Sequence, residues 1–229
     1  MNRQLAFDLP TRAALGRCDF FVSPGNALAL ATLDGWRDWP QGKMLLVGPA
    51  GAGKTHLAHV WAQASGAALV AAGDLGAADL PALLARGAVA VEDAETLAAS
   101  PGGEHALFHL HNLAAAAGAA LLVTAASPPR DWGLTLPDLA SRMQSAALIR
   151  LSGPDDALLS AVLVKQFADR QIAVPPALIP WLVQRIDRSF DAARAVVARL
   201  DAHALAEGRA ITRQLAADLI ERPDAGKGY

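Results

Sequence analysis

The sequence predicts an α/β fold with a central parallel five-stranded sheet and a small C-terminal all-α domain. The stretch Gly48–Thr55, Gly-Pro-Ala-Gly-Ala-Gly-Lys-Thr, follows an apolar run and precedes a helical pattern, which is the context of a phosphate-binding loop. Four further short apolar runs alternate with helical patterns, as buried parallel strands do. After Gly153 and Pro154 the pattern is helical throughout. The expected parts are a flexible leader (1–17), an α/β domain (18–152), a helical lid domain (153–222) and a tail (223–229).

The composition favours a globular protein and excludes several functional classes. Of the 229 residues, 53% are hydrophobic and 18% charged, so the chain can bury a substantial core. Residues 151–222 carry nine basic and nine acidic side chains, so this part lacks the basic face of a DNA-binding module. Cys18 is alone, which excludes an intramolecular disulfide and fits a reducing cytoplasm. There is no signal-peptide pattern and no apolar run of about 20 residues, so no membrane association is expected.

The elements follow from periodicity and turn residues. A helix is expected over 27–36 and a turn at Pro40–Gly42. Asp155 and Thr212 are expected to cap the first and last helices of the lid domain, and Gly208 to end the third. The expected strands are 44–47, 67–71, 88–91, 119–124 and 147–151. The other expected helices are 53–64, 80–86, 104–117, 136–143, 155–170, 176–186, 190–207 and 212–221.

The phosphate loop, residues 48–55, is the candidate nucleotide site. Its glycines let backbone N–H groups approach phosphate oxygens because no Cβ blocks them, and the helix that starts near Gly53 directs its positive end to the same place. Lys54 is expected to reach the β- and γ-phosphates, and Thr55 to bind Mg²⁺ through its hydroxyl. A glycine-rich turn with a surface lysine is the alternative, but all fixed positions of the motif match. The expected nucleotide-binding residues here are Gly48, Pro49, Ala50, Gly51, Ala52, Gly53, Lys54, Thr55 and His56.

Two carboxylates, Glu92 and Asp93, follow the apolar run 88–91. The carboxyl ends of strands in open α/β sheets face the ligand crevice, where phosphate-loop enzymes need an acid to orient Mg²⁺ and often a second acid to activate water. We expect Glu92 on the metal side and Asp93, as a catalytic residue, on the water side. An acidic surface turn is the alternative, and the position downstream of a phosphate loop favours the functional interpretation.

The run 119–124 ends in Thr124, whose hydroxyl could sense the γ-phosphate. An ordinary strand end with small residues is equally compatible. His105 and His109 share a helix face at the i, i+4 spacing that metal sites use, and His111 follows them. Because no acid completes an H-E-x-x-H arrangement and no cysteine is near, polar or half-buried helix positions are favoured over a metal site.

Three arginines lie in predicted helices from which they could reach a phosphate group. Arg142 ends a short helix beside apolar residues, and from there it could project onto a neighbouring subunit's nucleotide, where a guanidinium stabilises charge on the γ-phosphate. An exposed arginine is more often simply solvated. Arg194 and Arg199 lie in the third lid helix, and an arginine projecting from it onto the phosphates would couple the nucleotide to the angle of the lid.

The leader contains an apolar stretch, Gln4–Pro10, that is too short to fold alone and too apolar for an ordinary solvated tail. Leu5, Phe7 and Leu9 could anchor it in a groove of another protein. From the spacing alone, packing onto its own domain is favoured.

Taken together, these motifs resemble the AAA+ proteins related to the bacterial replication initiator DnaA. They look closest to the short Hda family, HdaA in alphaproteobacteria, which carries out regulatory inactivation of DnaA. The resemblance extends from Gln4 to about Ile220. The similar segments are Walker A (48–55), the end of Walker B (91–93), sensor 1 (122–129, with Thr124 and Ser127), the arginine-finger box (136–142, with Arg142) and the sensor 2 helix (190–201, with Arg194).

The resemblance implies partners and a role. Gln4, Leu5, Phe7 and Leu9 match a motif that binds the DNA polymerase sliding clamp, its β subunit, and this outweighs the packing alternative. It implies bound ADP or ATP with Mg²⁺, and a regulator that promotes hydrolysis of DnaA-bound ATP through Arg142 or its partner's equivalent, preventing over-initiation. In the initiator, a helix-turn-helix DNA-binding domain would follow the lid. Because the sequence ends shortly after the lid, no direct sequence-specific DNA binding is expected. Self-association is left open.

One residue departs from the family pattern. Glu92 stands where the usual Walker B acid pair has aspartate, and its extra methylene is expected to shift Mg²⁺ or to force another rotamer. The chain's own ATPase is therefore expected to be weak or absent, with nucleotide binding kept. The competing functions are a stand-alone ATPase or helicase loader, which should display a DNA- or helicase-binding extension, and a small-molecule phosphotransferase, which should show a second substrate pocket.

Overall fold

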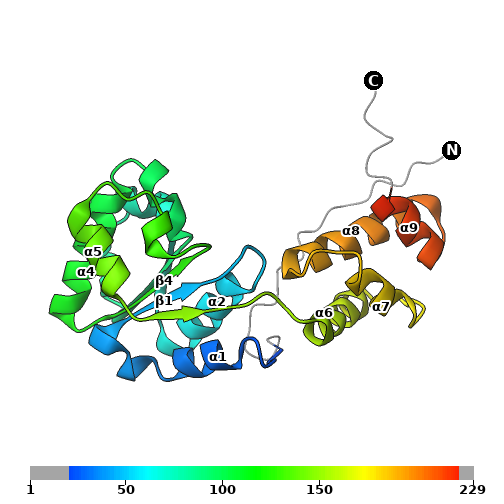
Figure 1. Cartoon of the computed structure of the whole chain (residues 1–229), viewed down its shortest axis with the longest axis horizontal. Coiled ribbons are helices and arrows are strands. Elements are labelled where there is room, and N and C mark those ends of the chain that lie inside the picture. The colour runs from blue at the N-terminus through cyan, green and yellow to red at the C-terminus, as the bar shows by residue number, and fades with distance from the viewer. Residues whose placement is uncertain (1–20, 222–229) are drawn as a thin grey trace.

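The structure is a computed structural model that describes residues 21–221. It contains an α/β unit and a helical unit, which lie beside each other along the long axis (Figure 1). The predicted clamp-binding residues Gln4, Leu5, Phe7 and Leu9 lie outside the described residues. Within the described range, no helix combines the length and the apolar character needed to cross a bilayer.

The sheet of the α/β unit has five parallel strands in the order β2-β3-β4-β1-β5. The register pairs Val47 with both Ala125 and Arg150, so the carboxyl ends of β1, β4 and β5 lie at one edge. Every residue of β1 and β4 is buried, which explains their continuous apolar sequences. The predicted five-stranded α/β fold is thus confirmed. The strands are β1 (Lys43–Val47), β2 (Ala68–Ala71), β3 (Ala88–Glu92), β4 (Ala120–Ala125) and β5 (Leu148–Arg150).

Helices cover both faces of this sheet and form two separate cores. Successive strand residues point to opposite faces, so Leu46 packs with Leu57 and Trp61 of α2, whereas Leu45 packs with Leu107 of α4. Each such fully buried side chain stabilises the fold by about 1.5–3 kcal/mol. The helices are α1 (Ala27–Asp34), α2 (Lys54–Ser65), α3 (Leu80–Leu84), α4 (Gly103–Ala117) and α5 (Pro137–Ser145), with 3-10 turns at Trp36–Asp38, Pro40–Gly42, Ala72–Ala77, Ala94–Ala99 and Pro129–Asp131.

The helical unit has its own core, in which Leu163, Phe167, Leu182 and Val197 are buried. The predicted helix over 176–186 is shorter than expected. It is preceded by Pro175 and Pro176, which lack backbone N–H groups, and it begins at Leu178 and ends at Val183. The helices of this unit are α6 (Asp156–Asp169), α7 (Leu178–Val183), α8 (Phe190–Glu207) and α9 (Arg213–Glu221).

The predicted caps of the helical unit are present. The Asp155 carboxylate accepts a hydrogen bond from the Leu158 N–H at 2.7 Å, and the Thr212 hydroxyl accepts one from the Leu215 N–H at 3.2 Å. Gly208 ends α8 in the left-handed conformation, with φ of 64°. These contacts satisfy backbone groups that each helix end would otherwise leave without a partner.

Candidate nucleotide-binding site

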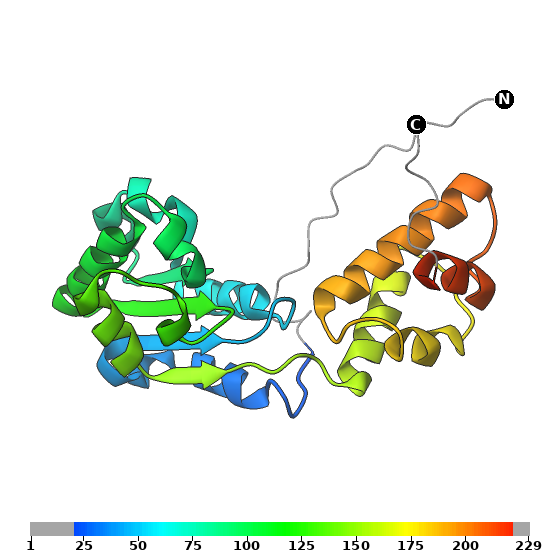
Figure 2. The same ribbon diagram turned by 45° about the horizontal axis from the view of Figure 1, so that its top comes forward.

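The phosphate loop connects β1 to α2 and faces the start of α8 (Figure 2). Lys54 is only 8% exposed, and its Nζ donates hydrogen bonds to the carbonyl oxygens of Gly48, at 2.7 Å, and Pro49, at 3.1 Å. The ammonium group therefore lies over the loop and not on the outer surface. This arrangement places a cation beside the backbone amides to which a phosphate group would bind.

Glu92, at the end of β3, interacts with Thr55 at the start of α2. Burial raises the pKa of the Glu92 carboxyl above its ordinary value, while its side-chain hydrogen bond with Thr55 and the nearby His59 oppose the shift. Its Oε1 atom is buried without a hydrogen-bond partner among the described residues. Mg²⁺ prefers oxygen ligands. The Thr55 hydroxyl and the Glu92 carboxylate, one of whose oxygens has no partner among those residues, therefore fit the ion. The longer glutamate side chain thus still reaches Thr55.

Asp93 and Thr124 are brought together although they lie on different segments. Asp93 has a left-handed backbone, with φ of 58°, which is uncommon for a residue other than glycine. Its N–H donates a hydrogen bond to the Thr124 hydroxyl at 3.3 Å, and Thr124 is completely buried at the end of β4. Thr124 therefore holds the turn that carries the acid pair. Ser127 lies beyond β4, and its carbonyl accepts a hydrogen bond from the Trp132 indole at 2.7 Å.

The start of α8 rests on the phosphate loop, a contact that the sequence did not predict. The Phe190 N–H donates a hydrogen bond to the Gly51 carbonyl at 2.8 Å. A Cβ atom added at Gly51 would lie 2.6 Å from the Ser189 Cβ, and one added at Gly53 would lie 3.0 Å from the Phe190 ring. These glycines, both with positive φ, are therefore needed for the close approach of α8 as well as for access to phosphate.

Arg194 lies one turn along α8 from this contact. It is half-exposed and pairs with Asp191 of the same helix. The carboxylate therefore holds the guanidinium on the helix that touches the phosphate loop, and a phosphate group in the loop would compete with Asp191 for it.

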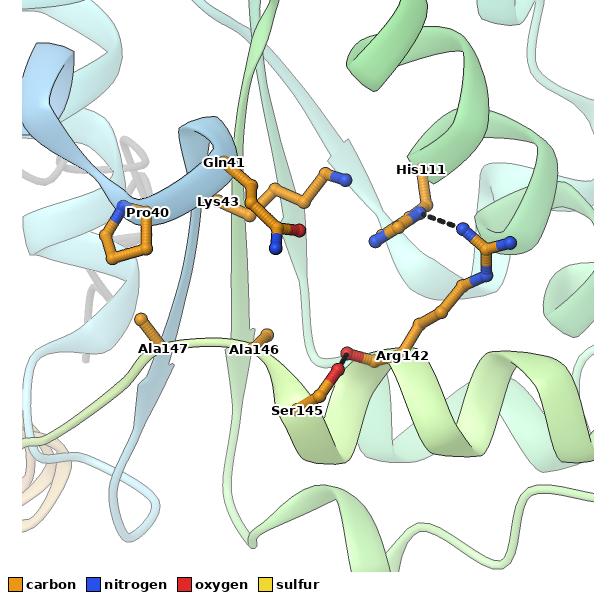
Figure 3. Close-up of a pocket in the computed structure, with 8 residues that line it drawn as sticks. All are labelled: Pro40, Gln41, Lys43, His111, Arg142, Ser145, Ala146 and Ala147. Atoms are coloured by element: carbon orange, nitrogen blue, oxygen red, sulfur yellow. Dashed lines mark hydrogen bonds between the residues drawn. The ribbon is translucent and has the colours of Figure 1, made fainter.

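Arg142 lies at the opposite edge of the sheet, near Lys43 at the start of β1 (Figure 3). Its Nη1 is 3.4 Å from His111 Nδ1, and its guanidinium carbon is 4.9 Å from the centre of the Phe108 ring. The phosphate loop begins after Val47, and five strand residues span about 13 Å. Arg142 therefore cannot contact a nucleotide held in the phosphate loop of the same chain.

The helix that carries Arg142 is held by Glu104 of α4. The carboxylate of Glu104 is 8% exposed and accepts hydrogen bonds from the N–H of Leu136, at 2.7 Å, and from the N–H and hydroxyl of Thr135, at 2.9 and 3.1 Å. Burial acts to raise the pKa of Glu104, but these hydrogen bonds outweigh it and leave the pKa below its ordinary value of 4.5. Glu104 thus fixes the start of α5 against α4.

Glu104→Ala is expected to lower the free energy of unfolding by about 2–4 kcal/mol, because two N–H groups and a hydroxyl lose a buried acceptor. Since folding lowers the pKa, this stabilisation is complete above pH 4.5 and is lost as the pH falls through the folded-state pKa. Urea unfolding at pH 7 and pH 4 measures both effects. Asp169→Ala, which removes an exposed pair with Lys165, is the control and should cost about 0–1 kcal/mol. Equal losses for the two variants would contradict this role.

No protein-family model matches the chain. Solved structures of similar fold include domain III of the replication initiation protein DnaA from Thermotoga maritima, with 18% identity and a TM-score of 0.76 over 93% of this chain and 100% of that chain. AMPPCP-bound DnaA from Aquifex aeolicus has 15% identity and a TM-score of 0.64, over 80% of this chain and 63% of that longer chain. The FIGL-1 AAA domain has 15% identity and a TM-score of 0.68, over 93% and 85%. The chain therefore has the fold of the AAA+ domains.

Proposed function

We propose that the chain is a nucleotide-binding AAA+ regulator of replication initiation, which binds the sliding clamp and promotes hydrolysis of DnaA-bound ATP. One observation carries this proposal. The residues suited to hold a nucleotide lie at the carboxyl edge of the sheet, whereas Arg142 lies at the amino edge. Such a chain has both halves of an ATPase centre but cannot join them alone, so a second AAA+ module must supply the complementary half.

The nucleotide half consists of the phosphate loop, Glu92 and the start of α8. ADP or ATP would take the loop amides and the Lys54 ammonium as phosphate ligands. The hydrogen bond from Phe190 to Gly51 links this loop directly to α8, so a bound phosphate would also set the position of the helical unit. The AMPPCP bound to the similar Aquifex DnaA supports a nucleotide of this class.

Mg²⁺ would be held by Thr55 and Glu92, and when bound it neutralises charge on the phosphates. Glu92→Gln keeps the size of the side chain but removes its charge. The Mg²⁺ concentration needed for half-maximal ATP binding is expected to rise about 10- to 100-fold. Titration of ATP at several Mg²⁺ concentrations measures this. Asp93→Asn, at the neighbouring exposed acid, is the control, and an equal rise in that variant would remove Glu92 from the metal side.

The second half is Arg142, which would act in trans on the ATP of DnaA. A guanidinium placed on the γ-phosphate stabilises the charge that develops there during hydrolysis. The contacts with His111 and Phe108 hold it against α4, and no carboxylate among residues 21–221 pairs with it, so no ion pair within that range has to break before it can reach a phosphate. The chain's own ATPase is proposed to be weak, with Asp93 the acid on the water side.

ATP turnover by DnaA, with clamp loaded on DNA, tests the function. Adding the chain should accelerate turnover, and adding a chain without residues 1–10 should accelerate it far less. Binding of that shortened chain to ADP should be unchanged, which separates clamp binding from nucleotide binding. Turnover that depends on this chain but not on DnaA would support the alternative, a stand-alone ATPase or helicase loader. No acceleration with either chain would contradict the proposal.

A further inference from the structure

A pocket of about 140 Å³ lies at the amino edge of the sheet, away from the phosphate loop. Lys43 of β1, His111 of α4 and Arg142 of α5 bring their polar groups to it, and Gln41 and Ser145 complete its polar lining. In Figure 3 the Lys43 ammonium and the Arg142 guanidinium lie on either side of the His111 ring. Three elements that are far apart in the sequence thus place two cations around one small space.

The positive charge of this pocket is not compensated within the described residues. Lys43 is 7% and His111 is 6% exposed, and no carboxylate is among the residues that line the pocket. Burial and the charge of Arg142 lower the pKa of Lys43. Burial and the charges of Lys43 and Arg142 lower the pKa of His111 to about 4, against the opposing hydrogen bond of Asn112. Lys43 is buried without an anion beside it among those residues, and the exposed Arg142 guanidinium adds a second positive charge at the mouth of the same pocket. Burying a cation without an anion is unfavourable, so the arrangement indicates a site that an anion completes.

The donors in the pocket define the chemistry of its ligand. Arg142 can only donate, so at neutral pH the uncharged His111 accepts through Nδ1 and helps to orient the guanidinium. Lys43 Nζ has no hydrogen-bond or ion-pair partner among residues 21–221 and supplies up to three donors. A guanidinium and an ammonium that face a common space match the oxygens of a carboxylate or phosphate group.

We propose that this pocket binds an oxyanion, a carboxylate or a phosphate group, between Lys43 and Arg142. Occupancy would draw Arg142 toward β1 and hold it there. An anion in the pocket would also compete with the nucleotide of DnaA for Arg142 and so reduce stimulation of ATP hydrolysis. This consequence rests on the proposed function.

The binding is measured without DnaA, so its failure is distinct from failure of the proposed function. The full chain is saturated with ADP, or carries Lys54→Ala, so that the phosphate loop does not bind the probe. Inorganic phosphate or acetate is then titrated while the ring resonances of His111 are followed by NMR. A saturable shift is expected, and the His111 pKa should rise from about 4 toward its ordinary value of 6.5 as the anion offsets the two cations.

Variants test whether Lys43 is a ligand. Lys43→Met is expected to weaken phosphate binding about tenfold or more, and Lys43→Arg, which keeps the charge, should retain it. Arg130→Met, at an exposed arginine paired with Asp131, should leave the binding unchanged. Tighter binding of phosphate than of acetate would identify a phosphate group, and the reverse order a carboxylate. No saturable shift in the native chain, or an equal shift in Lys43→Met, would overturn the proposal.

Discussion

Under the proposed function, Arg142→Ala is expected to lower stimulation of DnaA ATP hydrolysis by a factor of about 10³ or more, the usual contribution of an arginine finger. The side chain is exposed at the amino edge of the sheet and contacts Phe108 and His111 from outside the core, so its loss should leave the fold intact. The measurement is ATP turnover by DnaA with clamp on DNA, at saturating amounts of each variant.

Two controls make this prediction specific. Arg142→Lys keeps the charge but not the planar fork, and it should recover only a small part of the stimulation. Arg130→Ala, at an exposed arginine of the same unit, should behave as the native chain. Clamp and ADP binding by Arg142→Ala should both be unchanged. Full stimulation by that variant would assign the finger to another residue.

Lys54→Ala is expected to weaken ADP and ATP binding by about 10²–10³-fold, since charge-assisted hydrogen bonds to phosphate oxygens are lost. In the structure the Lys54 ammonium already lies in the loop, held by the carbonyls of Gly48 and Pro49. Phosphate oxygens would replace those carbonyls as acceptors, so the variant loses ligand contacts that are largely pre-organised. Calorimetric titration with each nucleotide measures the change.

Lys165→Ala is the matched control, because this lysine lies on α6 and pairs with Asp169 at the surface. It should bind both nucleotides as the native chain does. Circular dichroism should show that both variants are folded. If Lys54→Ala keeps the native affinity, the nucleotide does not bind in the phosphate loop, and the role proposed for Glu92 and Thr55 would have to be given up.

Much of the fold could be predicted because its signals are local. The apolar runs that became β1 and β4 are continuous since both faces of those strands are buried. The phosphate loop is one unbroken stretch, so its composition and its place between a strand and a helix could both be recognised. The predicted helix over 176–186 starts too early, because periodicity does not register how the adjacent prolines limit a helix start, and it also extends three residues beyond the observed end at Val183.

The contacts that complete the candidate site could not be predicted, because they join residues far apart in the sequence. Asp93 and Thr124 are 31 residues apart, and so are Glu104 and Thr135. No local pattern gives such a pairing. The mutual spacing of the histidines in α4 bears only on metal ligation, whereas His111 lies beside Lys43 and Arg142, which come from other elements. The contact of α8 with Gly51 could not be predicted either. Phosphate binding alone accounts for a glycine at that position, so nothing in the sequence indicates a second reason for it.

The placement of Arg142 and the phosphate loop at opposite ends of the same strands gives the molecule a direction. Any contact that joins one of these ends to the other is head to tail, and such contacts form rings or open rows instead of closed symmetric pairs. Under the proposed function, a chain inserted among DnaA modules would have two unlike neighbours, one facing its arginine and one facing its loop. A variant altered only at the Arg142 end, or only at the phosphate-loop end, could then bind a neighbour through its other end alone and would be confined to one terminus of a row of modules.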